Sequence, residues 1–376
     1  MDAVNSIDDL LAGIEAIHAS DLHLAAGSPP LVRVNGVLSP LEDVPVLTPE
    51  DTQQLLYQIL STEQQKRLEV DRQIDMSHSL AGIGRFRVNV FFQRGAVGAA
   101  FRLIPHKIRS LEELGLPPVL HKLTERPRGL VLVTGPTGSG KSTTLAAMID
   151  EINRTRAAHI LTIEDPIEFL HRHRKCLVNQ REIGGDARGF ADALRGALRQ
   201  DPDVILLGEM RDLETIGTAL TAAETGHLVF ATLHTRGAAA TIDRIIDVFP
   251  GEQQAQIRAQ LASALEGVVT QTLLPTADGR GRVAAMEIML PDYAVRNLIR
   301  QRKLEQMYSV IQTGTARGMQ TLEQSLADLV QRGTITTEVA VEASSYPDQL
   351  LGLLGRSAAG ANGESALSSG LRLAGS

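Results

Sequence analysis

The stretch from residue 135 to residue 143 constrains this chain more than any other. An apolar run at 130–134 before it predicts a buried strand, and residues 144–150 after it favour a helix. The pattern G-x-x-x-x-G-K-[ST] between a strand and a helix is the phosphate-binding loop. A glycine-rich turn that matched by chance would need four constrained positions and both flanks to coincide. The sequence predicts a nucleoside triphosphate site formed by Gly135, Pro136, Thr137, Gly138, Ser139, Gly140, Lys141, Ser142 and Thr143.

The residue types in this loop match the chemistry of a phosphate group. Glycines can take backbone angles that turn successive N–H groups toward one anion, and the helix that follows adds its positive dipole end. Lys141 is expected to reach the β- and γ-phosphates, and the Ser142 hydroxyl to ligate Mg²⁺. The loop therefore predicts a bound nucleoside triphosphate and Mg²⁺.

The composition narrows the kind of protein. A length of 376 residues suggests two or three domains, and 43% hydrophobic with 22% charged residues is ordinary for a globular chain. A net charge of −7 and only 3% aromatic residues argue against nucleic acid as a partner. A single cysteine, Cys176, cannot form an intramolecular disulfide or a multi-cysteine zinc site. The acidic N-terminus and the lack of a long apolar run predict a cytoplasmic protein.

Hydrophobic periodicity divides the chain into five ranges. Residues 1–106 predict a small antiparallel sheet with helices, including an Asn35-Gly36 hairpin turn. Residues 107–128 read as a proline-containing linker with a short helix at 110–115, and 129–290 alternate strands with helices around a mostly parallel sheet. Helices are expected at 252–270 and through 291–351, and 352–376 have the composition of a disordered tail.

Acidic residues follow two of the predicted buried strands. Glu209 comes after the apolar run 204–207, and Gly208 stands before it where many P-loop enzymes have Asp. Glu209 is expected to hold Mg²⁺ or to polarise the attacking water; the alternative is an ordinary acid at a helix N-terminus. Glu164 and Glu168 follow the strand at 160–163, and spacing alone does not decide which of them activates water.

Two histidines flank the predicted strand at 228–233. The separation of seven between His227 and His234 puts them on opposite faces of a regular strand, which makes a shared metal ion unfavourable. They are either polar strand-end residues satisfied by neighbours, or one of them senses the γ-phosphate through a hydrogen bond.

Taken together, four segments resemble the Walker A, Asp box, Walker B and His box of the secretion ATPase superfamily, in that order. These segments are 135–143, 162–169, 208–212 and 225–235. Residues 19–24 are similar to the opening signature of the type IV pilus retraction ATPases (PilT-type). Residues 294–301 look like the C-terminal motif of that group, with Val295 and Gln301 departing from it.

This resemblance implies an α/β fold: a RecA-like P-loop ATPase core, a smaller PAS-like α+β N-terminal domain and a helical C-terminal region. It favours Glu168 as the catalytic glutamate with Glu209 assisting, and it supports a role for both histidines, His234 more than His227. It also implies that Arg85 and Arg102 of the N-terminal domain reach the nucleotide phosphates. Without the resemblance, these arginines would be assigned to a solvated sheet face.

The implied function is that of a homohexameric ATP-hydrolysing motor that drives type IV pilus retraction by domain rotation about the linker. Its implied partners are an inner-membrane pilus platform protein and the pilus machinery. It would associate with the cytoplasmic face of the inner membrane only through these partners. The alternatives are an accessory retraction ATPase, a pilus-extension or type II secretion ATPase, a nucleic-acid translocase and a non-hydrolysing scaffold. Zinc and nucleic acid are not expected as ligands.

Overall fold

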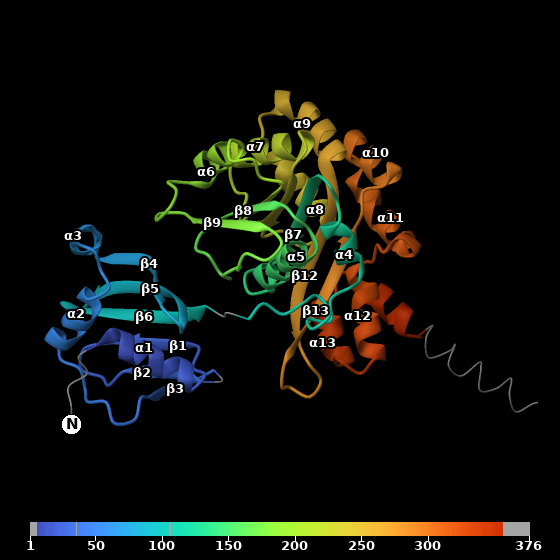
Figure 1. The fold of residues 1–376 in the computed structure, drawn as a ribbon. Helices are drawn as coiled ribbons and strands as arrows, with labels where there is room; N and C mark the ends of the chain where they lie inside the picture. The colour runs from blue at the N-terminus through green and yellow to red at the C-terminus, as the bar shows by residue number, and fades with distance from the viewer. Residues whose placement is uncertain (1–5, 35, 105–106, 356–376) are drawn as a thin grey trace, which may run out of the picture. The chain divides into compact units, whose positions relative to one another are not determined.

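The computed structural model describes residues 6–34, 36–104 and 107–355. The chain divides into two units (Figure 1), which are described separately. The first comprises Met1–Ile108 with Pro166–Leu170, and the second comprises Arg109–Asp165 with His171–Ser376. Among the described residues, every helix falls short of the length and apolar content that crossing a bilayer requires.

The first unit is built on a six-stranded antiparallel sheet with the order β3-β2-β1-β6-β5-β4. Its strands are β1 (Asp21–Leu24), β2 (Leu31–Val34), β3 (Val37–Pro40), β4 (Gln73–Leu80), β5 (Gly84–Gln93) and β6 (Ala96–Ile104). Its helices are α1 (Ile7–Ala16), α2 (Pro49–Tyr57) and α3 (Thr62–Asp71). Strand residues such as Phe86 and Phe101 share one core with helix residues such as Leu11 and Leu56. Because side chains alternate along a strand, the neighbouring polar residues share the other sheet face.

The second unit is built on a seven-stranded sheet with the order β13-β12-β7-β11-β10-β8-β9. Its strands are β7 (Gly129–Thr134), β8 (His159–Glu164), β9 (Leu177–Glu182), β10 (Val204–Leu207), β11 (Leu228–Leu233), β12 (Leu265–Pro275) and β13 (Arg282–Met289). All neighbouring pairs are parallel except β12 with β13.

Helices cover both faces of this sheet, as its continuous apolar strands require. The helices of the sheet layers are α4 (Val119–Thr124), α5 (Lys141–Thr155), α6 (Phe190–Ala197), α7 (Leu213–Glu224), α8 (Ala238–Asp247) and α9 (Gly251–Ala264). Val131 and Val133 pack with α4 and α5, whereas Leu130 and Leu132 pack with helices α6 to α9.

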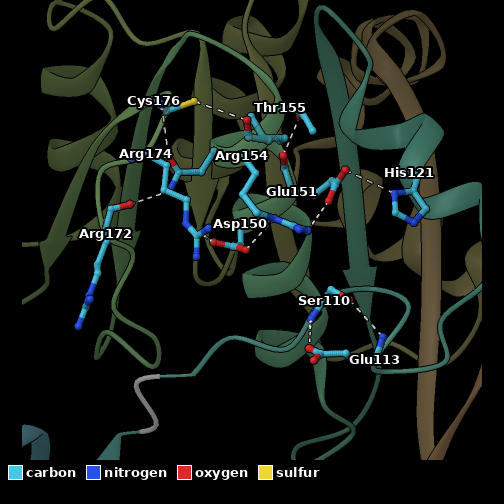
Figure 2. Close-up of polar contacts among 12 residues, drawn as sticks. Ser110, Glu113, His121, Asp150, Glu151, Arg154, Thr155, Arg172, Arg174 and Cys176 are labelled. Atoms are coloured by element: carbon cyan, nitrogen blue, oxygen red, sulfur yellow. Dashed lines mark hydrogen bonds and ion pairs between the residues drawn. The ribbon is translucent and has the colours of Figure 1, made fainter.

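Polar side chains on the last turns of α5 fasten two neighbouring segments (Figure 2). Asp150 pairs with Arg154 at 3.1 Å and with Arg174 at 3.5 Å, and Glu151 lies 3.8 Å from the Nδ1 atom of His121. Asn153 is fully buried, and its amide group donates to the carbonyl of Arg172 at 2.7 Å and accepts from the N–H groups of residues 174 and 176. The helix that begins at the P-loop therefore also anchors the loop before β9.

The C-terminal part continues as helices. These are α10 (Tyr293–Gln301), the 3₁₀ turns η1 (Leu304–Gln306) and η2 (Thr315–Arg317), α11 (Met307–Thr313), α12 (Leu322–Gln331) and α13 (Thr337–Ala343). A small core of apolar side chains packs α12 and α13 against β12 and β13 through Leu274, Ala285, Leu326 and Ala340. Residues 347–355 are helical, so the range predicted as a tail from 352 begins inside a helix; 356–376 lie outside the described residues.

The structure corrects two local predictions, and two further predictions fall on residues that it does not describe. The helix expected at 252–270 ends at Ala264, because the β-branched residues that follow pair with β7 as β12. The helix expected at 110–115 is a single turn in which Ser110 and Glu113 exchange hydrogen bonds (Figure 2), and Gly115, with φ of 65°, ends it. Asn35 of the predicted hairpin and residues 105–106, at the end of the predicted first domain, lie outside the described residues.

The buried amide of Asn153 yields a stability prediction. Asn153→Ala leaves the carbonyl of Arg172 and two N–H groups without their partner, so we expect the free energy of unfolding to fall by about 2–4 kcal/mol. Asn179→Ala, at an exposed asparagine, is the control and should change it by less than about 0.5 kcal/mol. Urea unfolding followed by circular dichroism measures both; equal losses would show that the Asn153 contacts add nothing.

Candidate active site

The predicted phosphate loop is bounded by β7 and α5. β7 is buried along its whole length, and α5 begins at Lys141. Gly135, Gly138 and Gly140 have φ values of 140°, 80° and 87°, in the region that favours glycine. A Cβ at Gly135 would lie 2.2 Å from the main-chain oxygen of Gln271, and one at Gly140 would lie 2.7 Å from its Nε2 atom. Both conformation and space therefore require glycine at these two positions.

Lys141 lies against the loop that precedes it. Its side chain is 8% exposed, and Nζ donates to the carbonyls of Gly135 at 2.9 Å and Pro136 at 3.0 Å. Ser142 and Thr143 follow in the first turn of α5 and are half-buried. A cation and hydroxyl groups thus lie at the positive end of the helix dipole, which is an arrangement suited to a phosphate chain.

Two of the predicted catalytic side chains meet at the carboxyl edge of the parallel sheet. Glu209 follows β10 and His234 follows β11, and Glu209 Oε1 lies 3.2 Å from His234 Nε2. Arg211 also pairs with Glu209, and this hydrogen bond raises the pKa of the Arg211 guanidinium. The N–H of Gly135 donates to the carbonyl of Leu233 at 3.3 Å, so the P-loop begins beside the strand that carries His234.

The glycine before Glu209 has a steric reason. A Cβ at Gly208 would lie 3.2 Å from the Cα of Glu164 and 3.3 Å from the carbonyl oxygen of Ile163. The Thr232 hydroxyl donates to the Gly208 carbonyl at 2.5 Å, which fixes the same peptide from the other side. A side chain at 208 would therefore need its neighbours on β8 to shift slightly, which favours glycine at this position.

Glu164 and Glu168 have different surroundings. Glu164 is 9% exposed, and its Oε1 accepts from Thr162 Oγ1 at 2.7 Å and from Gln180 Nε2 at 3.3 Å, which ties β8 to β9. Glu168 belongs to Pro166–Leu170, which is grouped with the first unit.

His227 lies at the other end of β11. Its Nδ1 is 3.0 Å from the carbonyl of Ala222, and its own carbonyl accepts from the N–H of Gly129, where β7 starts. Seven residue steps separate it from His234, a distance of about 23 Å along an extended strand. Within one subunit, His227 does not join the cluster of Glu209 and His234.

Arg85 and Arg102 share the polar face of the first unit's sheet. β5 and β6 place Arg87 opposite Arg102 and Arg85 opposite Ile104, so both predicted arginines point to one side. Arg85 donates to Ser77 Oγ at 2.5 Å, and Arg102, which is 70% exposed, pairs with Asp21 at 2.8 Å. Burial raises the pKa of Asp21, but hydrogen bonds from Ser20 and Arg102 outweigh it and bring that pKa below its ordinary value.

Arg296, in the predicted C-terminal motif, fastens the end of α9. Its guanidinium donates to the carbonyls of Ala262 at 2.5 Å and Ser263 at 2.8 Å, and it pairs with Glu266 at 3.0 Å. Because Glu266 is the second residue of β12, this arginine also joins α10 to the start of that strand. Arg300, one helical turn later, is exposed.

The residues of β12 that contact the end of β7 and the P-loop do not stand out in the sequence as functional residues. Thr270 Oγ1 lies 2.9 Å from Thr134 Oγ1, and the Gln271 side chain bonds to Ser139 and Thr144. The pattern that could have revealed them is the β-branched run Val268, Val269 and Thr270, which favours a strand over a helix.

A comparison with known families and structures agrees with this geometry. The family model described as "Type II/IV secretion system protein" matches residues 6–342. The chain belongs to this family. The type IV pilus retraction ATPase PilT of Pseudomonas aeruginosa is 55% identical over 342 residues, covering 91% of this chain and 99% of that protein. The type IV pilus ATPase PilU of the same organism is 42% identical and covers 94% of this chain and 93% of its own length.

Two solved structures share the fold. A crystal structure of the pilus retraction motor PilT with bound ADP superimposes with a TM-score of 0.86 at 53% identity, covering 92% of this chain and 98% of that chain. The ATPase DotB of Legionella pneumophila gives a TM-score of 0.79 at 31% identity, covering 90% and 96%. The predicted PilT-type resemblance and α/β fold class, with a RecA-like core, a smaller N-terminal domain and a helical C-terminal region, are confirmed.

The packing around Gly140 predicts how the loop responds to an added methyl group. Gly140→Ala combines an unfavourable φ with a contact to Gln271, so we expect a loss of about 2–3 kcal/mol in the free energy of unfolding. Gly138→Ala has a similar φ but open space around the new Cβ, and should cost about 1 kcal/mol. Thermal unfolding without nucleotide compares the two variants, and a loss at Gly138 as large as that at Gly140 would contradict the steric account.

Proposed function

We propose that this chain is a homohexameric ATPase motor that drives type IV pilus retraction and hence twitching motility. The observation that carries this proposal is the 55% identity to a retraction ATPase over nearly the full length of both chains. The alternative of a different type IV pilus ATPase has weaker support, since the identity to the type IV pilus ATPase PilU is 42%. The type II secretion and pilus-extension ATPases commonly carry a four-cysteine zinc element, which a chain with one cysteine cannot build.

The P-loop binds the nucleotide in this proposal. Backbone N–H groups of residues 135–143 receive the phosphates, and Lys141 neutralises the charge of the β- and γ-phosphates. ATP is the expected substrate, since the similar crystal structure of the pilus retraction motor PilT holds ADP.

Mg²⁺ fits the donors that Ser142 and Glu209 offer. Magnesium in nucleotide sites takes one or two protein oxygen ligands and completes its shell with phosphates and water. Among the described residues, no group of three or more His, Cys, Asp or Glu side chains could hold a metal ion by itself. A hydroxyl and a carboxylate beside a bound triphosphate are the donor set such a site uses, and the ion would neutralise charge on the transferred phosphoryl group.

Glu168 is the proposed general base, assisted by Glu209 and His234. The engagement of Glu164 with Thr162 and Gln180 supports this choice, because a carboxylate used to join two strands is less available to activate water. The pairing of His234 with Glu209 supports a role in sensing the γ-phosphate. For His227, the position at the far end of β11 favours a structural role over the predicted catalytic one.

Arg85 and Arg102 are proposed to reach the phosphates from the first unit. Their shared sheet face and the exposure of Arg102 support this assignment. Rotation of the two units about residues 107–128 would then couple phosphate chemistry to movement. We place the hexamer at the cytoplasmic face of the inner membrane, held there by a pilus platform protein.

The pairing of Glu209 yields a kinetic prediction. Glu209→Gln keeps the size of the side chain but removes its charge, so we expect ATP turnover to fall at least about a hundredfold while nucleotide still binds. Glu252→Gln, at an exposed acid in the first turn of α9, is the control and should leave turnover unchanged. Phosphate release measures turnover; unchanged turnover in Glu209→Gln would refute its assignment to the ATPase site.

Deletion of the gene tests the direction of the motor. Loss of a retraction motor should leave surplus surface pili and abolish surface motility. Electron microscopy of surface pili and a stab assay for twitching measure the two effects. Loss of pili would instead assign the chain to pilus extension.

A further inference from the structure

The P-loop is fastened to β12 by one buried side chain. Gln271 is 3% exposed, its Nε2 donates to the Ser139 carbonyl at 2.7 Å, and its Oε1 accepts from the Thr144 hydroxyl at 2.7 Å. These two partners lie on either side of the start of α5 at Lys141. One amide group therefore bridges the end of the loop and the first turn of its helix.

The orientation of this amide follows from its partners. The Ser139 carbonyl can only accept a hydrogen bond, so the NH₂ group must face it, and the Thr144 hydroxyl then donates to the amide oxygen. Both polar ends of the Gln271 side chain are satisfied in a region that excludes water. A buried amide held at both ends is rigid, because losing either bond leaves an unpaired polar atom.

The bond to Ser139 also determines where the next N–H points. In a planar trans peptide, the carbonyl of one residue and the N–H of the next lie on opposite sides of the chain. Because Gln271 holds the Ser139 carbonyl toward β12, the N–H of Gly140 is directed away from β12. Loops that bind phosphate work through such aligned N–H groups.

β12 and its neighbour β13 also contact the segment after His234. Thr270 pairs with Glu287 across β12 and β13, and Glu287 Oε1 accepts from the N–H of Ala238, the first residue of α8, at 2.6 Å. β12 and β13 thus support the P-loop and the start of α8 together, and Gln271 is the side chain that reaches the loop.

We propose that Gln271 is a positioning residue of the nucleotide site. By holding the Ser139 carbonyl and Thr144, it keeps residues 139–144 in the shape that receives the phosphates and so determines nucleotide affinity. This inference rests on the proposed assignment of residues 135–143 to nucleotide binding.

Substitution of Gln271 tests the proposal on the full chain. Gln271→Met keeps the volume and removes both hydrogen bonds, so we expect the Kd for ADP and the KM for ATP to rise about tenfold, with kcat within about threefold. Binding of a fluorescent ADP analogue and phosphate release measure these constants. A Kd and KM within twofold of the parent values, or a fall in kcat alone, would overturn the proposal.

A second glutamine provides the matched control. Gln320 is half-buried and donates to the Met286 carbonyl at 2.9 Å, on the strand next to Gln271. Gln320→Met should lower the melting temperature while the Kd for ADP stays unchanged. An equal rise in Kd for this variant would show that Gln271 acts only through general stability.

The Thr144 hydroxyl tests the same bridge from its other end. Thr144→Val should raise the Kd for ADP severalfold, whereas Thr144→Ser, which keeps the hydroxyl, should bind as the parent does. The double variant with Gln271→Met should be no weaker than Gln271→Met alone, because the two residues share one bond. Additive effects would contradict the bridge. If Gln271→Met does not fold, Gln271→Glu and Thr144→Val answer the same question.

Lys141→Ala separates this inference from the proposed function. If that variant binds ADP as tightly as the parent, the assignment of the P-loop itself is wrong. If it loses ADP while Gln271→Met keeps the parent Kd, only the positioning role is wrong.

Discussion

The close approach of β12 to the phosphate loop is the constraint on which the site depends. The main-chain oxygen of Gln271 leaves no room for a Cβ at Gly135, and its side chain leaves none at Gly140. The loop is therefore shaped from outside as well as by its own glycines. Its geometry is a property of β7, α5 and β12 together, although only the first two adjoin it in the sequence.

Two acidic side chains at neighbouring strand ends have different environments. Glu164 is buried and holds Thr162 and Gln180, whereas Glu209 faces a histidine and an arginine. The difference follows from the sheet itself. Because β8 lies between β9 and β10, its last residue has neighbours on both sides, and Gly208 lets β10 pass close to it.

The parts of the site that follow from local sequence were predictable, and those that follow from strand pairing were not. The apolar run 130–134, the glycines of the loop after it and the helix that follows form one continuous sequence signal. Glu209 and His234 were predicted in the same way, because each follows an apolar run that forms a strand. The first part of β12, residues 265–270, was predicted as helix, because its pairing with β7 joins residues more than a hundred positions apart. The same long-range pairing is the reason that Gln271 was not predicted as part of the site.

The single cysteine has a practical consequence for experiments on this protein. Cys176 is 2% exposed and its Sγ lies 3.1 Å from the Arg156 carbonyl, and burial raises the pKa of the thiol. A buried thiol that stays protonated reacts slowly with maleimides. A cysteine introduced at an exposed position in each unit would therefore take up a fluorophore selectively in the parent chain. Energy transfer between two such dyes could then follow the distance between the units through the ATPase cycle.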